Sequence, residues 1–310
     1  MFDRANDARV RSAAFQWLSS QVEAHGDVLP RTVLAEGFRL AGARVPLLGP
    51  QGIFKPRVLT TAPLSITTAP SGPYDDSFGP DGLLRYRYRG TDPSHADNVG
   101  LRFAMRERLP LVYFHGIVPG KYLAAWPVFI VNDEPDELAF SVAVDDAAHS
   151  GLIAATGMTA SVHDDREAVR REYITAAVRQ RLHQRAFRER VLDAYRRQCA
   201  FCRLRHEELL DAAHIVPDAE PEGEPLVSNG LALCKLHHAA FDRCFVGVRP
   251  DYVIQVRSDI LEEGDGPTLR FAIQALHGQR LDVPRRIDLR PASTMLEIRY
   301  DRFLQSLAQP

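Results

Sequence analysis

The first part of the chain has apolar positions that predict two helices and a turn. Apolar side chains recur at helical spacing through residues 8–25. Residues 29–42 predict a second, shorter helix, and strand-like runs around residues 49–52 predict a hairpin there. Helix, helix and hairpin indicate a winged-helix-like segment over residues 1–62. The same pattern fits a packing subdomain whose basic residues are simply solvated.

The middle of the chain changes to the two-residue period of β-strands. Residues 62–80 are rich in Pro, Gly, Ser and Thr and predict a loop or linker. Strand patterns follow at residues 83–92, 109–133 and 137–146. Between the first two, residues 97–108 predict a helix capped by Asp97 or Asn98. One strand, one helix and several further strands predict a small β-barrel domain over residues 63–150.

The last part predicts a connector, a long basic helix and a mixed domain. Residues 151–198 combine the connector with the helix, whose second half is rich in arginine. Such a charge run fits a solvated face or phosphate neutralisation equally well. Within residues 199–310, a strand pair is predicted at 246–261 and a terminal helix at 293–307. The whole pattern is that of an α+β protein.

Composition narrows the class of protein without naming a function. The 310 residues allow two or three domains, and the apolar and charged fractions, 45% and 25%, are ordinary for a soluble globular protein. No apolar run approaches a membrane span, so we expect no membrane partner. Four cysteines at metal-like spacing favour a reducing cytoplasm over a disulfide scaffold. A net charge of −2 means that any nucleic-acid contact needs local basic patches.

Most candidate metal-binding and catalytic residues lie within residues 199–242. Two pairs share the spacing C-x-x-[C/H], Cys199 with Cys202 and Cys234 with His237. Four such ligands without an open position predict a closed structural Zn²⁺ site, whereas a lone C-x-x-C is as often two buried thiols. Within the same stretch, a strand-like run holds a histidine, and a helix-like run carries a histidine and an aspartate four residues apart.

These residues stand in the motifs A-A-H-I, N-G-L-A-L-C and H-H-x-x-F-D, which resemble the HNH endonuclease family over roughly residues 175–260. The resemblance implies a ββα-metal fold in which His214 is the general base and Asn229 braces its loop. It also implies that His238 and Asp242 hold Mg²⁺ or another divalent cation. Ala213 stands where the family usually has a metal ligand. We expect Asp211 to replace it, because Asp211 and Ala213 share one side of the strand.

A second resemblance covers roughly residues 65–150. Y-D-D-S-F-G-P-D-G-L-L-R-Y-R-Y-R-G-T-D, D-N-x-x-L and P-L-V-Y-F-H-G are similar to motifs of the SRA/PUA-like modified-base readers. The resemblance implies aromatic faces and polar edges for a flipped base; the alternative is ordinary strand packing and turn capping. The predicted base-binding residues are Tyr74, Asp75, Asp76, Tyr86, Tyr88, Asp92 and Asn98. The predicted phosphate-binding residues are Arg85, Arg87, Arg185 and Arg188.

Together the two resemblances imply an endonuclease that cuts double-stranded DNA carrying a modified base, such as 5-methylcytosine, in defence against foreign DNA. A homodimer is one open expectation. One alternative is a nuclease that reads unmodified sequence. Another is a DNA-binding module with a decayed nuclease, which the alanine at position 213 favours and the intact His214, Asn229, His238 and Asp242 oppose.

Overall fold

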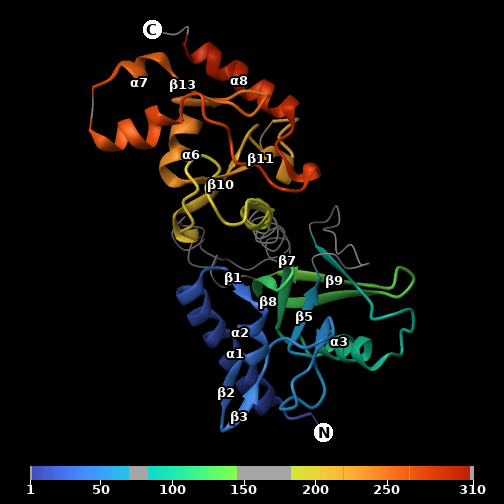
Figure 1. The fold of residues 1–310 in the computed structure, drawn as a ribbon. Helices are drawn as coiled ribbons and strands as arrows, with labels where there is room; N and C mark the ends of the chain where they lie inside the picture. Colours follow the sequence, from blue (N-terminus) through green and yellow to red (C-terminus); the bar gives the residue numbers. More distant parts are fainter. Residues whose placement is uncertain (1, 70–82, 145–182, 219, 265, 308–310) are drawn as a thin grey trace, which may run out of the picture. The chain divides into compact units, whose positions relative to one another are not determined.

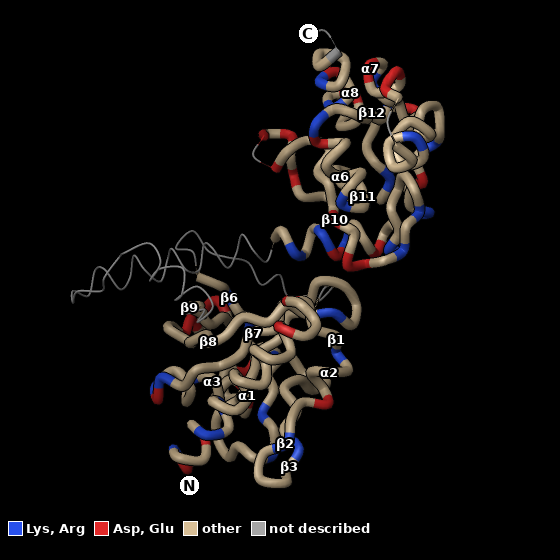
Figure 2. Tube along the Cα trace, turned by 90° about the vertical axis from the view of Figure 1, so that its left-hand side faces the viewer, with Lys and Arg blue, Asp and Glu red and all other residues tan. Residues whose placement is uncertain are grey.

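The computed structural model describes residues 2–69, 83–144, 183–218, 220–264 and 266–307. The chain divides into two compact units, residues 1–182 and 183–310, which appear in blue to green and in yellow to red in Figure 1. Each unit mixes helices with strands, which confirms the expected mixed α and β class. Basic and acidic positions occur throughout the described parts of both units (Figure 2), as the small net charge suggests.

The first unit is built on a seven-stranded sheet. Its strand order is β4-β5-β7-β8-β9-β6, with β1 paired to β8, and only β5 and β7 run parallel. The long hairpin of β7 and β8 forms its centre. The strands are β1 (Val28–Pro30), β4 (Ile53–Phe54), β5 (Ser65–Thr68), β6 (Leu84–Arg87), β7 (Leu111–Val118), β8 (Lys121–Glu134) and β9 (Ala139–Val144).

This sheet curls so that its two ends approach each other. Strands β5 and β6 are separated by three strands in the order, yet Tyr86 Oη of β6 donates a hydrogen bond to Thr67 O of β5 at 3.4 Å. A Cβ built on Gly52, just before β4, would lie 3.0 Å from the same hydroxyl. The result is a curled half-barrel, with apolar side chains such as Phe140 and Val142 buried in it.

Two helices, α1 (Arg4–His25) and α2 (Arg31–Glu36), pack against this sheet and confirm the predicted helical spacing. Apolar residues of α1 share a core with Val112 and Phe114 of β7. The buried Arg11 of α1 pairs with Asp7 at 2.5 Å and donates to the carbonyl of Pro63 at 3.0 Å. Residues 1–62 are therefore packed tightly onto the following segment, and a domain boundary at residue 62 stays a prediction.

The hairpin predicted at residues 49–52 is wrong in position. The hairpin is formed instead by β2 (Phe38–Leu40), within the segment predicted as helix, and β3 (Ala43–Val45), just after it. Its two turn residues, Ala41 and Gly42, have φ of 48° and 81°, the sign that a tight two-residue hairpin turn requires. Alanine rarely adopts this backbone conformation, so nothing in the residue types at this turn indicated it.

The predicted helix of the middle segment is α3 (Ala96–Arg106). Its N-cap is His95, whose Nδ1 accepts from the backbone of Asp97 at 3.2 Å, not Asp97 or Asn98 as predicted. Asn98 is fully buried and its amide is used elsewhere, as described below. The strands predicted around this helix are confirmed, whereas a closed barrel is not established by the curled sheet.

The second unit contains a ββα arrangement. Strand β10 (Leu210–His214) pairs antiparallel with β11 (Gly230–Cys234), and helix α6 (Lys235–Asp242) follows directly. Residues 183–194 are helical and bury Phe187 and Val191 against this hairpin. A second hairpin, β12 (Val246–Val248) with β13 (Ile254–Val256), and helix α8 (Ser293–Leu307) confirm the strand pair and the terminal helix predicted there. The predicted connector and the first half of the basic helix lie outside the described residues. A short helix, α7 (Ser258–Glu262), follows β13.

Candidate active site and metal centre

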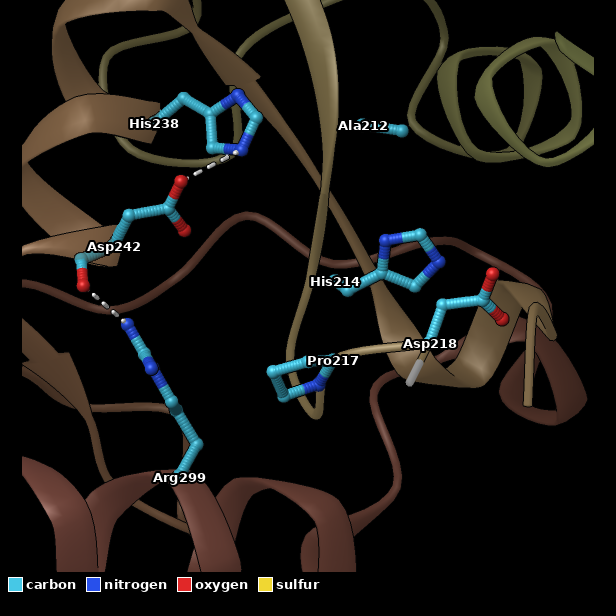
Figure 3. Close-up of a pocket in the computed structure, with 7 residues that line it drawn as sticks. All are labelled: Ala212, His214, Pro217, Asp218, His238, Asp242 and Arg299. Atoms are coloured by element: carbon cyan, nitrogen blue, oxygen red, sulfur yellow. Dashed lines mark hydrogen bonds and ion pairs between the residues drawn. The ribbon is translucent and has the colours of Figure 1, made fainter. Parts of the chain in front are cut away.

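One pocket of about 420 Å³ in the second unit gathers residues from β10, α6 and α8. The alternation of a strand places Ala212 and His214 on the pocket side of β10, while Ala213 is fully buried in the core. The lining residues, shown in Figure 3, are Ala212, His214, Pro217, Asp218, His238, Asp242 and Arg299. The structure thus brings together three of the predicted catalytic and metal-binding residues at one surface.

His214 is held by an aromatic stack. Its ring lies parallel to that of Phe187, with 3.9 Å between centroids and 9° between planes. Its Nε2 is buried and forms no hydrogen bond with the described residues. Burial lowers the pKa of His214, and nearby His238 lowers it further, while Asp218 and Asp242 oppose this shift. The neutral imidazole, the form that accepts a proton, is therefore favoured.

Asn229 stands at the end of the loop that follows His214. It is buried, and its Oδ1 accepts from the backbone N–H of Val216 at 2.9 Å. Its Nδ2 donates to the carbonyls of Val216 and Glu224 at 2.9 and 3.1 Å. All of these bonds join Asn229 to the loop's backbone, so its side chain fixes the path of the chain immediately after the histidine.

His238 lies between two carboxylates on α6 and β10. Its Nε2 is 3.3 Å from Asp242 Oδ2, one helical turn away, and its Nδ1 is 3.7 Å from Asp211 Oδ2. A single imidazole cannot turn both nitrogens toward one cation. Asp242 and Asp211 therefore occupy different positions around His238. Asp211 also lies 3.8 Å from the guanidinium of Arg188 and does not line the pocket.

Sequence reasoning missed three residues of this pocket region. Asp218 follows His214 by four residues, and this short spacing was the only feature of the sequence that indicated its closeness to the His214 imidazole. Arg299 comes from α8, where its guanidinium donates to the carbonyls of Phe241 and Asp242 at 2.5 and 3.2 Å and stacks 4.6 Å over the Phe241 ring. Figure 3 shows Arg299 and Asp218 at opposite sides of the pocket mouth. Phe187, which stacks on His214, is the third.

The four predicted zinc ligands come together. The ligand atoms of Cys199, Cys202, Cys234 and His237 all lie within 4.8 Å of one another. In a tetrahedral site with Zn–S bonds of about 2.3 Å, ligand atoms stand about 3.8 Å apart, so the cluster needs little adjustment. His237 turns Nδ1 to the thiols, 3.2 Å from Cys234 Sγ, and its Nε2 donates to Ala272 O at 2.7 Å. The cluster suits a structural zinc, with the carbonyl fixing the tautomer.

The predicted base-binding tyrosines lie inside the curled sheet. Tyr86 and Tyr88 are both buried, and Tyr88 packs against Phe140 with 4.6 Å between ring centroids. The Tyr88 hydroxyl bonds Asp133 and receives a hydrogen bond from Arg102 at 2.8 Å. These contacts are those of a core side chain, and a role in base stacking stays a prediction.

Asp92 and Asn98, predicted to hydrogen-bond the edge of a flipped base, form hydrogen bonds within one loop. Asp92 accepts from the backbone and hydroxyl of Ser94 at 2.8 and 2.7 Å, a turn cap. Asn98 Oδ1 accepts from the Arg89 backbone at 2.9 Å, and its Nδ2 donates to the carbonyls of Arg89 and Asp92. Their base-binding role also stays a prediction. Three further members of the predicted set lie outside the described residues: Tyr74, Asp75 and Asp76.

The predicted phosphate-binding arginines are engaged to different degrees. Arg85 pairs with Glu134 within the sheet, whereas Arg87 is exposed and donates to a backbone carbonyl at 3.3 Å. Arg188 donates to two backbone carbonyls at the start of β10, at 3.2 and 2.8 Å, and Arg185 is exposed. Arg188 is thus built into the nuclease unit, and phosphate binding by these four residues stays a prediction.

A ββα unit in which a half-buried histidine lines one pocket with a histidine–carboxylate pair fits metal-dependent hydrolysis of phosphodiesters. Residues 199–249 match the family model described as HNH endonuclease. The match identifies an HNH endonuclease domain in this part of the chain and supports a nuclease, a hydrolase of phosphodiester bonds; nucleases of this family use a divalent metal. A search of curated proteins found no match to the chain.

Two solved structures are similar to the chain at low identity. One is titled "Modification dependent TagI restriction endonuclease", with 15% identity, coverage of 78% of this chain and 82% of that chain, and a TM-score of 0.28. The other is the "Type IV phosphorothioation-dependent restriction endonuclease ScoMcrA", with 15% identity, coverage of 76% and 57%, and a TM-score of 0.21. At these TM-scores, any conclusion about this chain must come from its own residues.

None of the helices among the described residues combines the length and apolar character needed to cross a bilayer. The expected cytoplasmic location and the homodimer remain predictions.

Proposed function

We propose that the chain is a DNA endonuclease that acts on DNA carrying a modified base. The observation that carries the nuclease part is the convergence of His214 of strand β10 with His238 and Asp242 of helix α6 on one pocket, at spacings that the sequence already implied. The modification dependence rests on the reader-like motifs of the first unit. Restriction of foreign DNA would be the biological setting.

His214 takes the proton from the attacking water in this mechanism. Its lowered pKa keeps it neutral near pH 7, and the stack on Phe187 fixes the ring that receives the proton. Asp218, at the pocket mouth, then stabilises the imidazolium that forms. Water adds to phosphorus as the bond to the leaving sugar oxygen breaks, and a second proton returns to that oxygen from solvent.

His238 through Nε2 and Asp242 would hold the divalent cation. A bound cation supplies charge stabilisation to the phosphate, and Mg²⁺ typically needs only one or two protein carboxylates beside water and substrate oxygens. Asp211, whose Oδ2 lies 3.7 Å from His238 Nδ1, would then orient His238 from behind through its charge, as carboxylates commonly do for metal-binding histidines. This replaces the simpler idea of Asp211 as a direct ligand, because the two carboxylates face different nitrogens.

The first unit is proposed to be the reader, an SRA/PUA-like half-barrel preceded by a winged-helix-like segment. The curled sheet and the helix–helix–hairpin order of residues 4–45 support this proposal. Flipping a base costs a few kcal/mol of unstacking, which a pocket must return by stacking and hydrogen bonds.

A second candidate is an HNH nuclease whose first unit reads unmodified sequence. It is favoured by one observation: Tyr88 and Asn98, predicted to contact the base, use their polar atoms within the unit.

Matched duplexes with and without 5-methylcytosine or a related modification separate the two candidates. Wild-type protein with Mg²⁺ should cut the modified duplex at least several-fold faster, and His214→Ala should cut neither. Equal cutting of both duplexes, across the common cytosine modifications, would leave the nuclease and remove the modification dependence. Full cleavage by His214→Ala would show that His214 is not the general base.

A further inference from the structure

A second pocket of the nuclease unit, of about 470 Å³, is lined mainly by arginines. It lies apart from the residues of the active-site pocket and shares none of them. Three segments supply its wall: the end of the basic helix, the loop after Cys202, and the segment that follows β13 and α7. The lining arginines are Arg196, Arg203, Arg205, Arg285 and Arg290.

The charge of this pocket is largely uncompensated. Its one lining carboxylate, Asp282, is already engaged, since it accepts from Arg196 at 2.9 and 3.0 Å and from Gln198. Five arginines against one aspartate leave a formal charge of 5 − 1 = +4 around the pocket. Among the described residues, the exposed side chains of Arg203, Arg205 and Arg285 have no hydrogen-bond or ion-pair partner. Like charges held together in this way repel unless an anion lies between them.

The backbone holds these arginines in place at a cost. Arg196 and Arg203 have φ of 56° and 60°, a left-handed conformation that costs non-glycine residues free energy. The loop of Arg203 begins at the zinc cluster, and the Asp282 N–H donates to Ala200 O at 2.9 Å. The zinc loop and the segment of Arg285 are therefore tied together, so the backbone positions that carry these arginines are held close to one another.

We propose that this pocket binds the phosphate backbone of duplex DNA, away from the bond that is cut. The inference rests on the proposed DNA substrate. Its geometry fits one continuous substrate, because helix 183–194 carries Phe187 beside His214 and ends just before Arg196. Seven residues separate position 187 from the helix end, or roughly 10 Å at 1.5 Å per residue, about three base pairs of a duplex. This length of helix is short compared with a DNA duplex, so one duplex is the occupant to which we commit.

Salt dependence of binding tests this assignment. We would place Arg203→Ala, Arg205→Ala and Arg285→Ala in the full-length His214→Ala protein, and measure affinity for a short duplex between about 50 and 200 mM salt. Each lost phosphate contact should reduce the slope of log affinity against log salt by about 0.9, and the triple variant should bind about 10-fold or more weakly. The loss should be similar for modified and unmodified duplexes, because phosphate contacts carry no sequence information.

Arg286→Ala is the matched control. Arg286 neighbours Arg285 and changes the net charge equally when replaced, but it pairs with Asp288 and does not line the pocket. Arg285→Ala alone serves as the second variant, because it lies outside the zinc loop and does not disturb the cysteines. A slope and affinity indistinguishable from those of Arg286→Ala, for both the single and the triple variant, would overturn the proposal. Failure of the proposed nuclease would instead appear as absent cleavage by the wild type.

Discussion

His214 shows how one side chain is prepared for proton transfer by its surroundings. Burial against Phe187 removes water from the ring and penalises the charged form, while Asp218 and Asp242 partly restore it. The balance favours the neutral ring. Because the neutral ring is the base, catalysis should persist to lower pH than an exposed histidine would allow.

The lowered pKa of His214 predicts the direction in which the pH profile of cleavage is shifted. A group whose pKa is lowered by burial remains deprotonated below the ordinary value of about 6.5. The acid limb of kcat/KM for a small phosphodiester should therefore have its midpoint below that value. Asp218→Asn removes an attraction for the imidazolium, so the midpoint should move further down. A midpoint that moves up in Asp218→Asn would contradict the assigned direction.

Asp211 and Asp242 can be separated by their dependence on metal concentration. If Asp211 only orients His238, Asp211→Asn should weaken metal binding by about 10- to 100-fold, and added Mg²⁺ should restore the rate. Asp242→Asn should remain impaired at every Mg²⁺ concentration, because a ligand is lost. The measurement is the Mg²⁺ concentration that gives half-maximal cleavage. Identical metal curves for the two variants would support Asp211 as a direct ligand.

At the scale of elements, the zinc cluster joins the end of the basic helix to the β11–α6 corner. Cys199 and Cys202 precede β10, whereas Cys234 and His237 end β11 and begin α6. A closed site of this kind contributes directly to folding free energy. The hairpin that carries His214 is thus fixed at the end remote from the histidine.

Metal analysis should find about one zinc per chain that survives mild chelation. Cys202→Ser should lose it and lower the free energy of unfolding of the second unit by several kcal/mol, seen as a clear fall in Tm. Cys244→Ser is the control, because Cys244 lies outside the cluster and is only half-buried. A folded, active and zinc-free wild type would refute the site.

Gly230 lies against the basic helix that carries Phe187, the residue stacked on His214. A Cβ at Gly230 would lie 2.5 Å from Val191 Cγ2 and 3.0 Å from the Phe187 ring. Gly230→Ala should therefore push the helix away and disturb the ring that stacks on His214, at a cost of about 1–3 kcal/mol in stability. Cleavage should fall more than the loss of folded protein explains, as judged by activity per folded molecule at a temperature well below Tm. Unchanged specific activity would mean that the stack is dispensable.

Periodicity and motif spacing predicted the main helices and many strands, but residues 62–80, predicted as a loop or linker, contain β5. Three predicted residues, His214, His238 and Asp242, line one pocket. His214, Asn229, His238 and Asp242 stand at family spacings, so their assembly followed from the sequence. Phe187, Asp218 and Arg299 reach the pocket region through tertiary packing, which leaves no mark in local spacing. The misplaced hairpin has a similar cause, because an alanine with positive φ is sustained by the surrounding fold rather than by its own preference.

At the scale of the whole molecule, recognition and cleavage are assigned to different units. One buried methyl group contributes only about 0.8 kcal/mol, or about a 4-fold difference in affinity. Full-length His214→Ala should therefore bind a methylated duplex only several-fold more tightly than its plain counterpart, measured by equilibrium titration at fixed salt. A much larger preference would mean that a polar group is left unpaired by the plain base. Equal affinity would contradict the reader proposal.

Because α8 contributes Arg299 to the pocket, the pocket is completed late while the ribosome makes the chain. His214, His238 and Asp242 are all made before Arg299, which follows Asp242 by 299 − 242 = 57 residues. At about 5–20 residues per second, a ribosome needs about 3–11 s to cover that distance. During this interval the growing chain has His214, His238 and Asp242 without the arginine that lines the pocket with them. A nuclease arranged in this order gains its complete site only after its hairpin and catalytic helix have had time to fold.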